Sequence, residues 1–371
     1  MFWTAVYGAV FFEALIASLI LTPLALAWGR RWGMIDRPGA RKVHAAPTPR
    51  SGGLAIYGAF VGVMLIDLLL LWVMVRGDMA GERLAPFRAN LSAVAPRFAA
   101  IFVGLTFLFV VGVIDDRKGL GPGVKLLAQI LSAVPLLIAG VRISVFLHGV
   151  LPDAAATALG ALLTVAWVVL LTNSLNFLDN MDGLTGGVSF VISLVLAGFA
   201  LVVGHVFMTA AYLALAGAVL GFLRYNWSPA RLFMGDAGSL TIGYALAALT
   251  INARYYEPGA AATGLPVLIP LIVMGVPLFD TVSVLFIRWR TGRPLMVGDT
   301  NHISHRLVGL GFNTRQAVTF LCVLTLVVAL MALPLRYLPA RAALLHVLGV
   351  AALFVLIYLM ERVAQRKTPN G

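Results

Sequence analysis

Long apolar segments recur along almost the whole chain, and they restrict the protein to a helical fold inside a membrane. A helix needs about 20 apolar residues to cross the hydrocarbon core of a bilayer, and segments of that kind follow one another between short polar connections. Only 11% of the 371 residues are charged, whereas soluble domains carry about 25%. The sequence therefore predicts an all-α, polytopic membrane protein. About eleven transmembrane helices are expected, near residues 7–28, 52–75, 97–114, 122–141, 156–174, 184–203, 205–223, 237–253, 264–287, 316–334 and 342–361.

The connections between these segments leave no room for a separate soluble domain. All are shorter than 30 residues, and the chain shows no internal repeat and no low-complexity tract. We therefore expect one membrane-embedded domain over residues 1–371. The single cysteine, Cys322, excludes an intrachain disulfide and gives no indication of a metal-thiolate site.

Lys and Arg residues are divided unequally between the two sides of the membrane that these helices define. With the N-terminus outside, 19 of the 27 fall in inner segments, and short cytoplasmic loops carry such an excess. We therefore expect the N-terminus outside and the C-terminus in the cytoplasm. The formal net charge of +12 does not indicate nucleic-acid binding, because the basic residues lie between apolar spans rather than on one patch. The inner loops would cover about 29–51, 115–125, 173–184, 224–238 and 288–315.

The inner loop at 173–184 concentrates amide and carboxylate side chains where an apolar helix ends, among them Asn176, Asp179 and Asp182. The two carboxylates are three residues apart, which places them on one face of a helical turn. Two anions at that spacing repel each other unless a metal or a cationic ligand lies between them. Ionisable groups at membrane helices are costly and mark functional sites, so this loop is the first candidate for a binding site.

Four further carboxylates lie at inner membrane edges. Asp115 and Asp116 follow one apolar span directly, Asp236 precedes another, and Asp280 lies near the inner end of a third. Because the chain has only 15 acidic residues, their concentration favours a common site, and oxygen ligands suit a hard cation such as Mg²⁺. Two other interpretations stay open. The Asp pair could cap its helix beside the basic residues that follow it, and Asp236 could be a helix N-cap.

Two inner loops combine basic residues with turn-forming ones. The loop at 29–51 is rich in Arg, Lys, Pro and Gly, which fits either a positive-inside anchor or a phosphate-facing loop. The loop at 288–315 contains His302 and His305 together with several Arg residues. A zinc site would need a tighter group of His and Cys ligands. We therefore interpret this loop as a source of cations for a diphosphate, beside carboxylates for a metal.

Four of these motifs, in this order, resemble the polyprenyl-phosphate N-acetylhexosamine-1-phosphate transferases. These are membrane enzymes that move a sugar 1-phosphate from a UDP-sugar to a polyprenyl phosphate. The resemblance runs from Asp36 to about Arg315. The first loop and the His-x-x-His-Arg-Leu ending resemble the bacterial branch that uses UDP-N-acetylglucosamine and starts O-antigen, enterobacterial common antigen or teichoic acid. The matching stretches are the Asp pair at 115–116 with K-L-L-A-Q at 125–129, N-F-L-D-N-M-D-G-L at 176–184, F-M-G-D-A-G-S at 233–239 and the His loop at 302–305.

The resemblance implies a catalytic group of three aspartates. Asp236 would hold Mg²⁺, with Mn²⁺ as an alternative metal. Asp115 would activate the undecaprenyl phosphate acceptor, and Asp116 would assist with metal or phosphate positioning. UMP would leave to the cytoplasm, so the protein would lie in the cell membrane with its active site on the cytoplasmic face. A homodimer is left open.

The substrate contacts that the resemblance implies fall into two groups. One would contact the nucleotide and the sugar phosphate, with an aromatic ring stacked on uracil. The other would steady the diphosphate through donated hydrogen bonds and positive charge. The apolar tail of the acceptor would lie in a groove between helices that opens to the lipid. The first group is Asn176, Asp179, Asp182 and Phe233, and the second is Lys125, His302, His305 and Arg306.

One residue departs from the pattern of this branch. Ser304 stands between the two histidines, where the branch often has a third imidazole. A catalytically silent homologue is therefore one alternative. An ion-coupled transporter is another, because carboxylates within membranes also mark ion pathways, and Asp67 is the one candidate at mid-membrane depth. Many transporters contain internal repeats, and their absence here favours the transferase.

Overall fold

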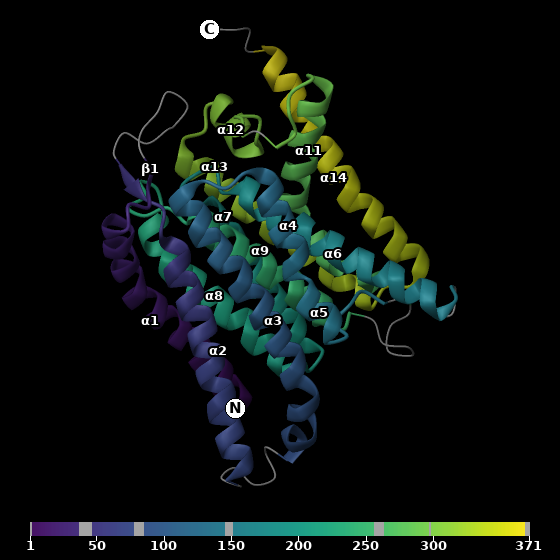
Figure 1. The fold of residues 1–371 in the computed structure, drawn as a ribbon. Helices are drawn as coiled ribbons and strands as arrows, with labels where there is room; N and C mark the ends of the chain where they lie inside the picture. The colour runs from purple at the N-terminus through teal and green to yellow at the C-terminus, as the bar shows by residue number, and fades with distance from the viewer. Residues whose placement is uncertain are drawn as a thin grey trace.

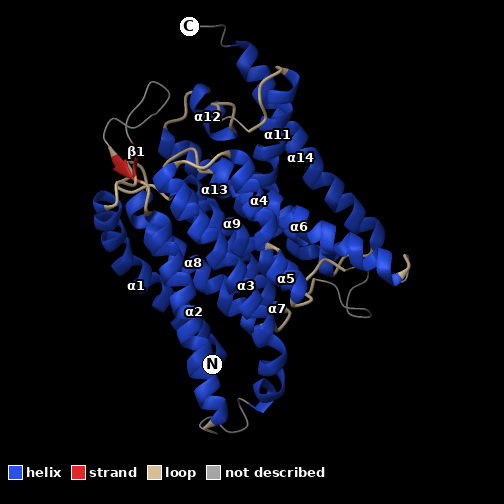
Figure 2. Ribbon diagram, viewed as in Figure 1, coloured by secondary structure: helices blue, strands red, loops and turns tan. Residues whose placement is uncertain are grey.

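The computed structural model describes residues 2–36, 47–77, 85–144, 151–255, 263–296 and 298–367. Part of the predicted basic loop at 29–51, namely 37–46, lies outside these residues. The described part is almost entirely helical, apart from one small hairpin (Figures 1 and 2). The helices are α1 (Phe2–Arg31), α2 (Gly52–Arg76), α3 (Ala85–Lys118), α4 (Pro122–Ser132), α5 (Val134–Ile138), α6 (Asp153–Leu178), α7 (Leu184–Val202), α8 (Val206–Asn226), α9 (Gly235–Asn252), η2 (Leu265–Leu268), α10 (Ile269–Val273), α11 (Gly275–Arg290), α12 (Ile303–Gly309), α13 (Thr314–Ala332), η3 (Leu333–Arg336) and α14 (Ala340–Lys367).

Eight helical segments of the described chain are long and apolar enough to cross a membrane, and they involve α1, α2, α3, α6, α7, α8, α13 and α14. A ninth candidate is the bent pair Leu265–Val273 and Gly275–Arg290, whose halves meet at 71°. These findings confirm an all-α polytopic membrane protein, but not the expected count of eleven spans. The segment expected at 122–141 is divided into α4 and α5. The segment expected at 237–253 is α9, which other helices cover, so it can contain polar and small residues that a lipid-facing helix would not.

α9 forms the centre of the bundle, where every residue from Ala237 to Thr250 is buried. It packs mainly against α3 and α6, and also against α2. Glycines permit these close contacts. A Cβ added to Gly112 of α3 would lie 2.5 Å from the Cα of Ala237, and one added to Gly243 would lie 2.7 Å from the Cα of Thr172. Small residues let membrane helices approach closely, so the start of α9 is held against the ends of its neighbours.

A short β-hairpin connects the first inner loop to the start of α9. Its strands β1 (Ile35–Asp36) and β2 (Thr48–Pro49) are antiparallel, and Arg50 Nη2 donates to Asp36 Oδ1 at 2.6 Å. The backbone N–H of Phe233 donates to the Pro49 carbonyl at 2.8 Å, and the Phe233 carbonyl accepts from the Gly52 N–H at 3.0 Å. The residues just before α9 therefore extend the hairpin.

Several helix ends meet at one end of the bundle. α3 and α6 end there, and α4 and α9 begin there, joined to one another by the side-chain contacts described below. α12 and β1 lie at the same end (Figure 1). The fold thus gathers at one end the predicted inner loops that the structure describes, although they are far apart in the sequence.

Candidate functional site

Two carboxylates, an ammonium group and an amide from four helices form the centre of the candidate site. Lys125 Nζ, on α4, lies 2.6 Å from Asp236 Oδ2 and 3.1 Å from Asp115 Oδ2. Asn176 Nδ2, near the end of α6, donates to Asp236 Oδ1 at 3.0 Å. The structure thus brings together four residues that the sequence predicted separately. We call Asp115, Lys125, Asn176 and Asp236 the Asp–Lys cluster.

A tight turn between α3 and α4 places Lys125 over Asp115. Gly119 follows α3 with a φ of +71°, a conformation that residues with a side chain rarely adopt. The backbone N–H of Leu120 then donates to Asp115 Oδ1. Pro122 begins α4, at a position where its missing N–H leaves no hydrogen bond unmade. Lys125 follows within the first turn, so its ammonium group returns to the carboxylate ten residues earlier.

Asp116 supports the cluster from the backbone side. Its two oxygens accept from the N–H groups of Asp236 at 2.8 Å and Ala237 at 2.9 Å, at the start of α9. Gly235 has a φ of +72°, and a Cβ there would lie 2.6 Å from Asp116 Oδ2. The sequence predicted that Asp116 would assist with metal or phosphate positioning, and this stays a prediction. Both of its carboxylate oxygens hold the backbone at the start of α9, which is an N-terminal capping role.

The two carboxylates of the 173–184 loop have different surroundings. Asp182 Oδ2 accepts from the Ala230 N–H at 2.9 Å, so it ties this loop to the connection between α8 and α9. The pKa of Asp179 is raised to about 7, mainly by burial and also by the negative charge of Asp236. A cation bound beside Asp236 would offset the smaller part of this increase in pKa, which comes from negative charge.

The predicted histidine loop is anchored by Asp280, which is fully buried on α11. Asp280 Oδ2 lies 2.7 Å from His302 Nδ1, and Oδ1 accepts from the Ile303 N–H at 2.7 Å. The rings of Phe177 and His305 each lie 6.5 Å from the His302 ring, both edge-to-face. Burial lowers the pKa of His305, and the neighbouring His302 lowers it as well. The loop therefore packs directly against the 173–184 stretch.

Ser304 and Arg306 act in the packing of α12. Ser304 is fully buried and its Oγ donates to Asn180 Oδ1 at 2.6 Å. This bond gives the residue that departs from the family pattern a structural role. Arg306 donates to the Asn301 carbonyl at 2.6 Å and to Ser283 Oγ at 3.2 Å. These bonds hold the loop against α11, and the diphosphate contact expected of Arg306 stays a prediction.

A buried arginine that the sequence did not single out stabilises the same loop. Arg288 is 1% exposed, and its Nε donates to Asp299 Oδ2 at 3.0 Å. Burial alone would raise the pKa of Asp299, but the hydrogen bonds from Arg288 and Asn301 lower it to about 2. The guanidinium carbon of Arg288 also lies 5.5 Å from the centre of the Phe177 ring. A single Arg in a basic loop gives no sequence signal for such a role.

Two other motif residues have clear places. Phe233 is half-buried and lies two residues before the start of α9. Its backbone hydrogen bonds fix it to the hairpin. Gln129, one turn after Lys125, exchanges amide hydrogen bonds with Asn173, at 2.6 Å and 3.3 Å. Gln129 is four residues after Lys125 and Asn173 is three residues before Asn176, so each lies on the same helix face as a member of the cluster. This spacing was the sequence signal available for the pair.

The donor set of the cluster suits a hard cation. Within the described residues, no three Asp, Glu, His or Cys side chains converge closely enough to enclose a metal ion. Mg²⁺ does not require this, because proteins bind it through one or two carboxylates together with water and substrate phosphates. Asp115 and Asp236 supply oxygen atoms, and a single ammonium group serves both. The residues present therefore fit a magnesium ion that arrives with a phosphate substrate.

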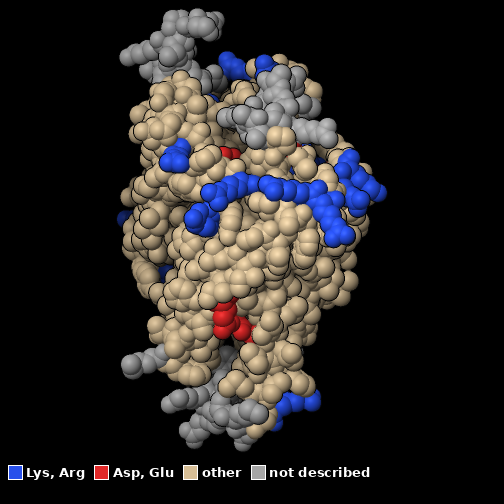
Figure 3. Space-filling view, turned by 90° about the vertical axis from the view of Figure 1, so that its left-hand side faces the viewer, with Lys and Arg blue, Asp and Glu red and all other residues tan. Residues whose placement is uncertain are grey.

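Asp67 lies outside this site. It is half-buried on α2 and forms a side-chain hydrogen bond with Glu13 of α1. Figure 3 shows an acidic patch low on the apolar face, well separated from the Lys and Arg side chains above it. Within the described residues, the hydrogen bonds that hold the Asp–Lys cluster together do not include Asp67 or Glu13.

Comparisons with known proteins agree on one family. Residues 98–254 match the model of glycosyl transferase family 4. The chain is 32% identical to a probable undecaprenyl-phosphate N-acetylglucosaminyl 1-phosphate transferase of Bacillus subtilis, over 96% of this chain and 90% of that protein. It is also 32% identical to the decaprenyl-phosphate N-acetylglucosaminephosphotransferase of Mycolicibacterium smegmatis, over 96% and 89%. A phospho-N-acetylmuramoyl-pentapeptide-transferase of Desulforudis audaxviator is 30% identical, over 84% and 92%.

Proposed function

This chain belongs to glycosyl transferase family 4, and we propose that it transfers N-acetylglucosamine 1-phosphate, or the 1-phosphate of a related N-acetylhexosamine, from a UDP-sugar to undecaprenyl phosphate. The observation that carries the proposal is the Asp–Lys cluster at one end of the membrane helices. A water-soluble nucleotide sugar and a lipid-anchored phosphate can both reach such a place. The lipid-linked sugar would begin the synthesis of a cell-envelope polysaccharide, with UMP as the second product.

The cluster supplies the groups that this phosphoryl transfer needs. An oxygen of the acceptor phosphate forms a bond to the β-phosphorus of the UDP-sugar, and the bond from that phosphorus to the bridging oxygen breaks, leaving its electron pair on UMP. Asp115 would take a remaining proton from the acceptor phosphate. Lys125 would neutralise phosphate charge, and Asn176 would orient Asp236 through their hydrogen bond.

Asp236, with Asp115 beside it, would hold Mg²⁺, or Mn²⁺ in its place. When bound, the ion would supply positive charge to the diphosphate as negative charge develops there. Asp116 would keep Asp236 in place through the start of α9. Asp179 and Asp182 would face the nucleotide and the sugar phosphate. The His302 imidazole, held through its Nδ1 by Asp280, would contribute its Nε2 to the diphosphate.

We also propose that the end carrying the cluster faces the cytoplasm. The excess of Lys and Arg in the predicted inner loops supports an N-terminus outside and a C-terminus inside the cell membrane. The whole chain, residues 1–371, would act as one membrane-embedded domain. UDP-sugars are cytoplasmic substrates in this scheme, and the acceptor phosphate would be reached from the inner leaflet.

The proposal is tested by UMP release from the purified protein in detergent with Mg²⁺ and undecaprenyl phosphate. The panel of donors is UDP-N-acetylglucosamine, UDP-N-acetylgalactosamine and UDP-N-acetylmuramoyl-pentapeptide, each with an EDTA control. We expect UMP release that needs both the lipid phosphate and the metal, with one donor preferred. A folded protein that releases no UMP with any donor would contradict the proposal. The remaining interpretations would then be a catalytically silent homologue and an ion-coupled transporter.

A further inference from the structure

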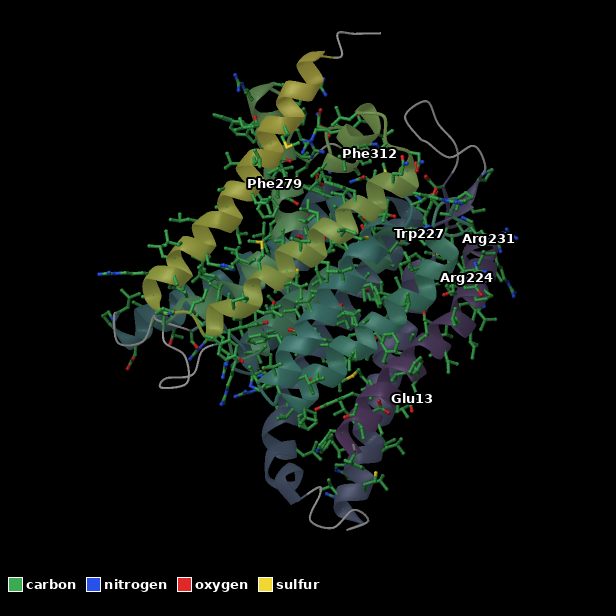
Figure 4. The ribbon with its side chains drawn as sticks, turned by 180° about the vertical axis from the view of Figure 1, so that it is seen from behind. Glu13, Arg224, Trp227, Arg231, Phe279 and Phe312 are labelled. Atoms are coloured by element: carbon green, nitrogen blue, oxygen red, sulfur yellow. The ribbon has the colours of Figure 1, made fainter. Side chains whose placement is uncertain are left out.

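An open groove lies between α1 and α8, on the opposite side of the bundle from the helices that carry Asp115 and Lys125. α3, α4 and α6 are at the front in Figure 1, whereas α1, α8 and α13 face the viewer in Figure 4. The groove has a volume of about 580 Å³, within the range of sites that bind small molecules. Its lining consists of Leu15, Leu19, Leu220, Leu223, Arg224 and Trp227.

The groove results from how closely the two helices pack. A Cβ on Gly217 would lie 2.3 Å from the Phe11 carbonyl oxygen, and one on Gly221 would lie 2.6 Å from Ser18 Cβ. The helix backbones are therefore in contact, and the leucines beside the glycines form the walls of a furrow along the line of contact. Both helices are long and apolar enough to span the membrane, so a lipid of the bilayer can reach the furrow.

One end of the groove is cationic. Arg224 lies in the last turn of α8 and is exposed. The chain then folds back, and the Arg231 N–H donates to the Tyr225 carbonyl at 2.9 Å. Arg231 is also exposed, so a second arginine lies near Arg224. Figure 4 shows Arg224, Trp227 and Arg231 together at this end. Among the residues that the structure describes, none that lines the groove is acidic. Figure 3 shows that Lys and Arg side chains form a band across the neighbouring face.

We propose that this groove binds one anionic glycerophospholipid. The phosphate would lie at Arg224 and Arg231, Trp227 would lie at the level of the headgroup, and an acyl chain would run along the four leucines. Long basic side chains reach from the helix to the membrane surface, and basic pockets between helices bind anionic headgroups there. Phosphatidylcholine has the same phosphate but also carries a cation, which two neighbouring arginines would repel. The net negative charge of an anionic lipid is therefore favoured at this end of the groove.

Native mass spectrometry of the full-length protein tests the proposal. The protein would be released from nanodiscs that contain equal amounts of dioleoyl phosphatidylglycerol and dioleoyl phosphatidylcholine. We expect the wild type to retain one phosphatidylglycerol in preference to phosphatidylcholine. The double variant R224A/R231A should lose this preference by at least fivefold, since each basic residue near the surface contributes about that factor. The control Arg341→Ala, at the start of α14, should behave as the wild type.

A second variant keeps the test independent of charge removal. Leu19→Trp fills the furrow, and it should lower retention of phosphatidylglycerol while both arginines remain. Gel filtration would establish that each variant is folded. Equal retention of the two lipids by the wild type, or no effect of R224A/R231A, would overturn the proposal. Competitive displacement of phosphatidylglycerol by undecaprenyl phosphate would also overturn it, because the groove would then be the acceptor site. The readout is lipid retention, so it does not depend on transferase activity.

Discussion

The Asp–Lys cluster and the Asp280–His302 pair both place carboxylates beside nitrogen donors, but they differ in how fully those carboxylates are satisfied. Asp280 is completely buried, and a ring nitrogen and a backbone N–H occupy its two oxygens. Lys125 and Asp236 each keep 24% of their side chains exposed, and one ammonium group is shared by two carboxylates. The pair is therefore built to hold a shape, whereas the cluster can exchange a partner for a metal or a phosphate.

The largest effect should follow from Asp236→Asn. The amide keeps the size of the side chain but removes the charge, so we expect UMP release to fall at least 10²–10³-fold, as when one electrostatic partner of a transition state is removed. Folding should be retained. Asp67→Asn, a carboxylate variant away from the cluster, is the matched control and should remain active. Turnover of Asp236→Asn close to the wild type at saturating Mg²⁺ would remove Asp236 from the metal site.

Asp280→Asn should lower the stability of the protein more clearly than Asp236→Asn does, and lower its turnover less. An amide N–H₂ group would face either the Ile303 N–H or the His302 ring, so one buried hydrogen bond would be lost. We expect a loss of about 1–3 kcal/mol in the free energy of unfolding and a turnover reduced by roughly tenfold, since His302 loses its anchor. Thermal unfolding in detergent measures the loss of stability, and UMP release measures the loss of turnover. Unchanged thermal stability would show that the pair is not structural.

The pH dependence of turnover tests whether Asp179 titrates beside the Asp–Lys cluster. Its raised pKa of about 7 means that the carboxyl group is mostly protonated below that pH and ionised above it. If the ionised form faces the metal-bound substrate, UMP release should rise as pH increases through about 7. Added Mg²⁺ should move the midpoint lower, because a cation favours the charged form. Asp179→Asn should lack this step, and a midpoint that is insensitive to Mg²⁺ would contradict the assignment.

The smallest effect should follow from Ser304→Ala, which removes the bond to Asn180. One neutral hydrogen bond contributes about 0.5–1.5 kcal/mol, and we expect a loss in unfolding free energy of that size with only a few-fold loss of turnover. Ser174→Ala is the control and should cost less, because the hydroxyl of this buried α6 serine has no hydrogen-bond partner among the described residues. A Ser304→Ala protein without activity would show that the hydroxyl takes part in the reaction.

Much of the fold could be predicted because lipid-facing helices must be apolar along a known length. The helices fall where the apolar segments lie, and the motif loops lie at the ends of the segments. The count of eleven spans could not be confirmed, since α9 is buried among other helices and α4 is too short. Periodicity carries no information about which neighbours a central helix has.

The members of the candidate site could be predicted as residue types, but their partners could not. Asp116 is adjacent to Asp115, yet its side chain caps a helix that begins more than a hundred residues later. Asp280 stood out only as a carboxylate near a membrane edge, and its bond to His302 depends on how α11 bends away from η2 and α10. Contacts of this kind arise from tertiary packing, which local patterns do not record.

Electron paramagnetic resonance of bound Mn²⁺ tests the central claim most directly, because it reports metal binding at the cluster without requiring turnover. The protein would be titrated with Mn²⁺ in the presence of UDP-N-acetylglucosamine. We expect one bound ion in the wild type, its loss in Asp236→Asn and its retention in folded Asp280→Asn protein. Undiminished Mn²⁺ binding by Asp236→Asn would contradict the claim that the Asp–Lys cluster is the metal and diphosphate site.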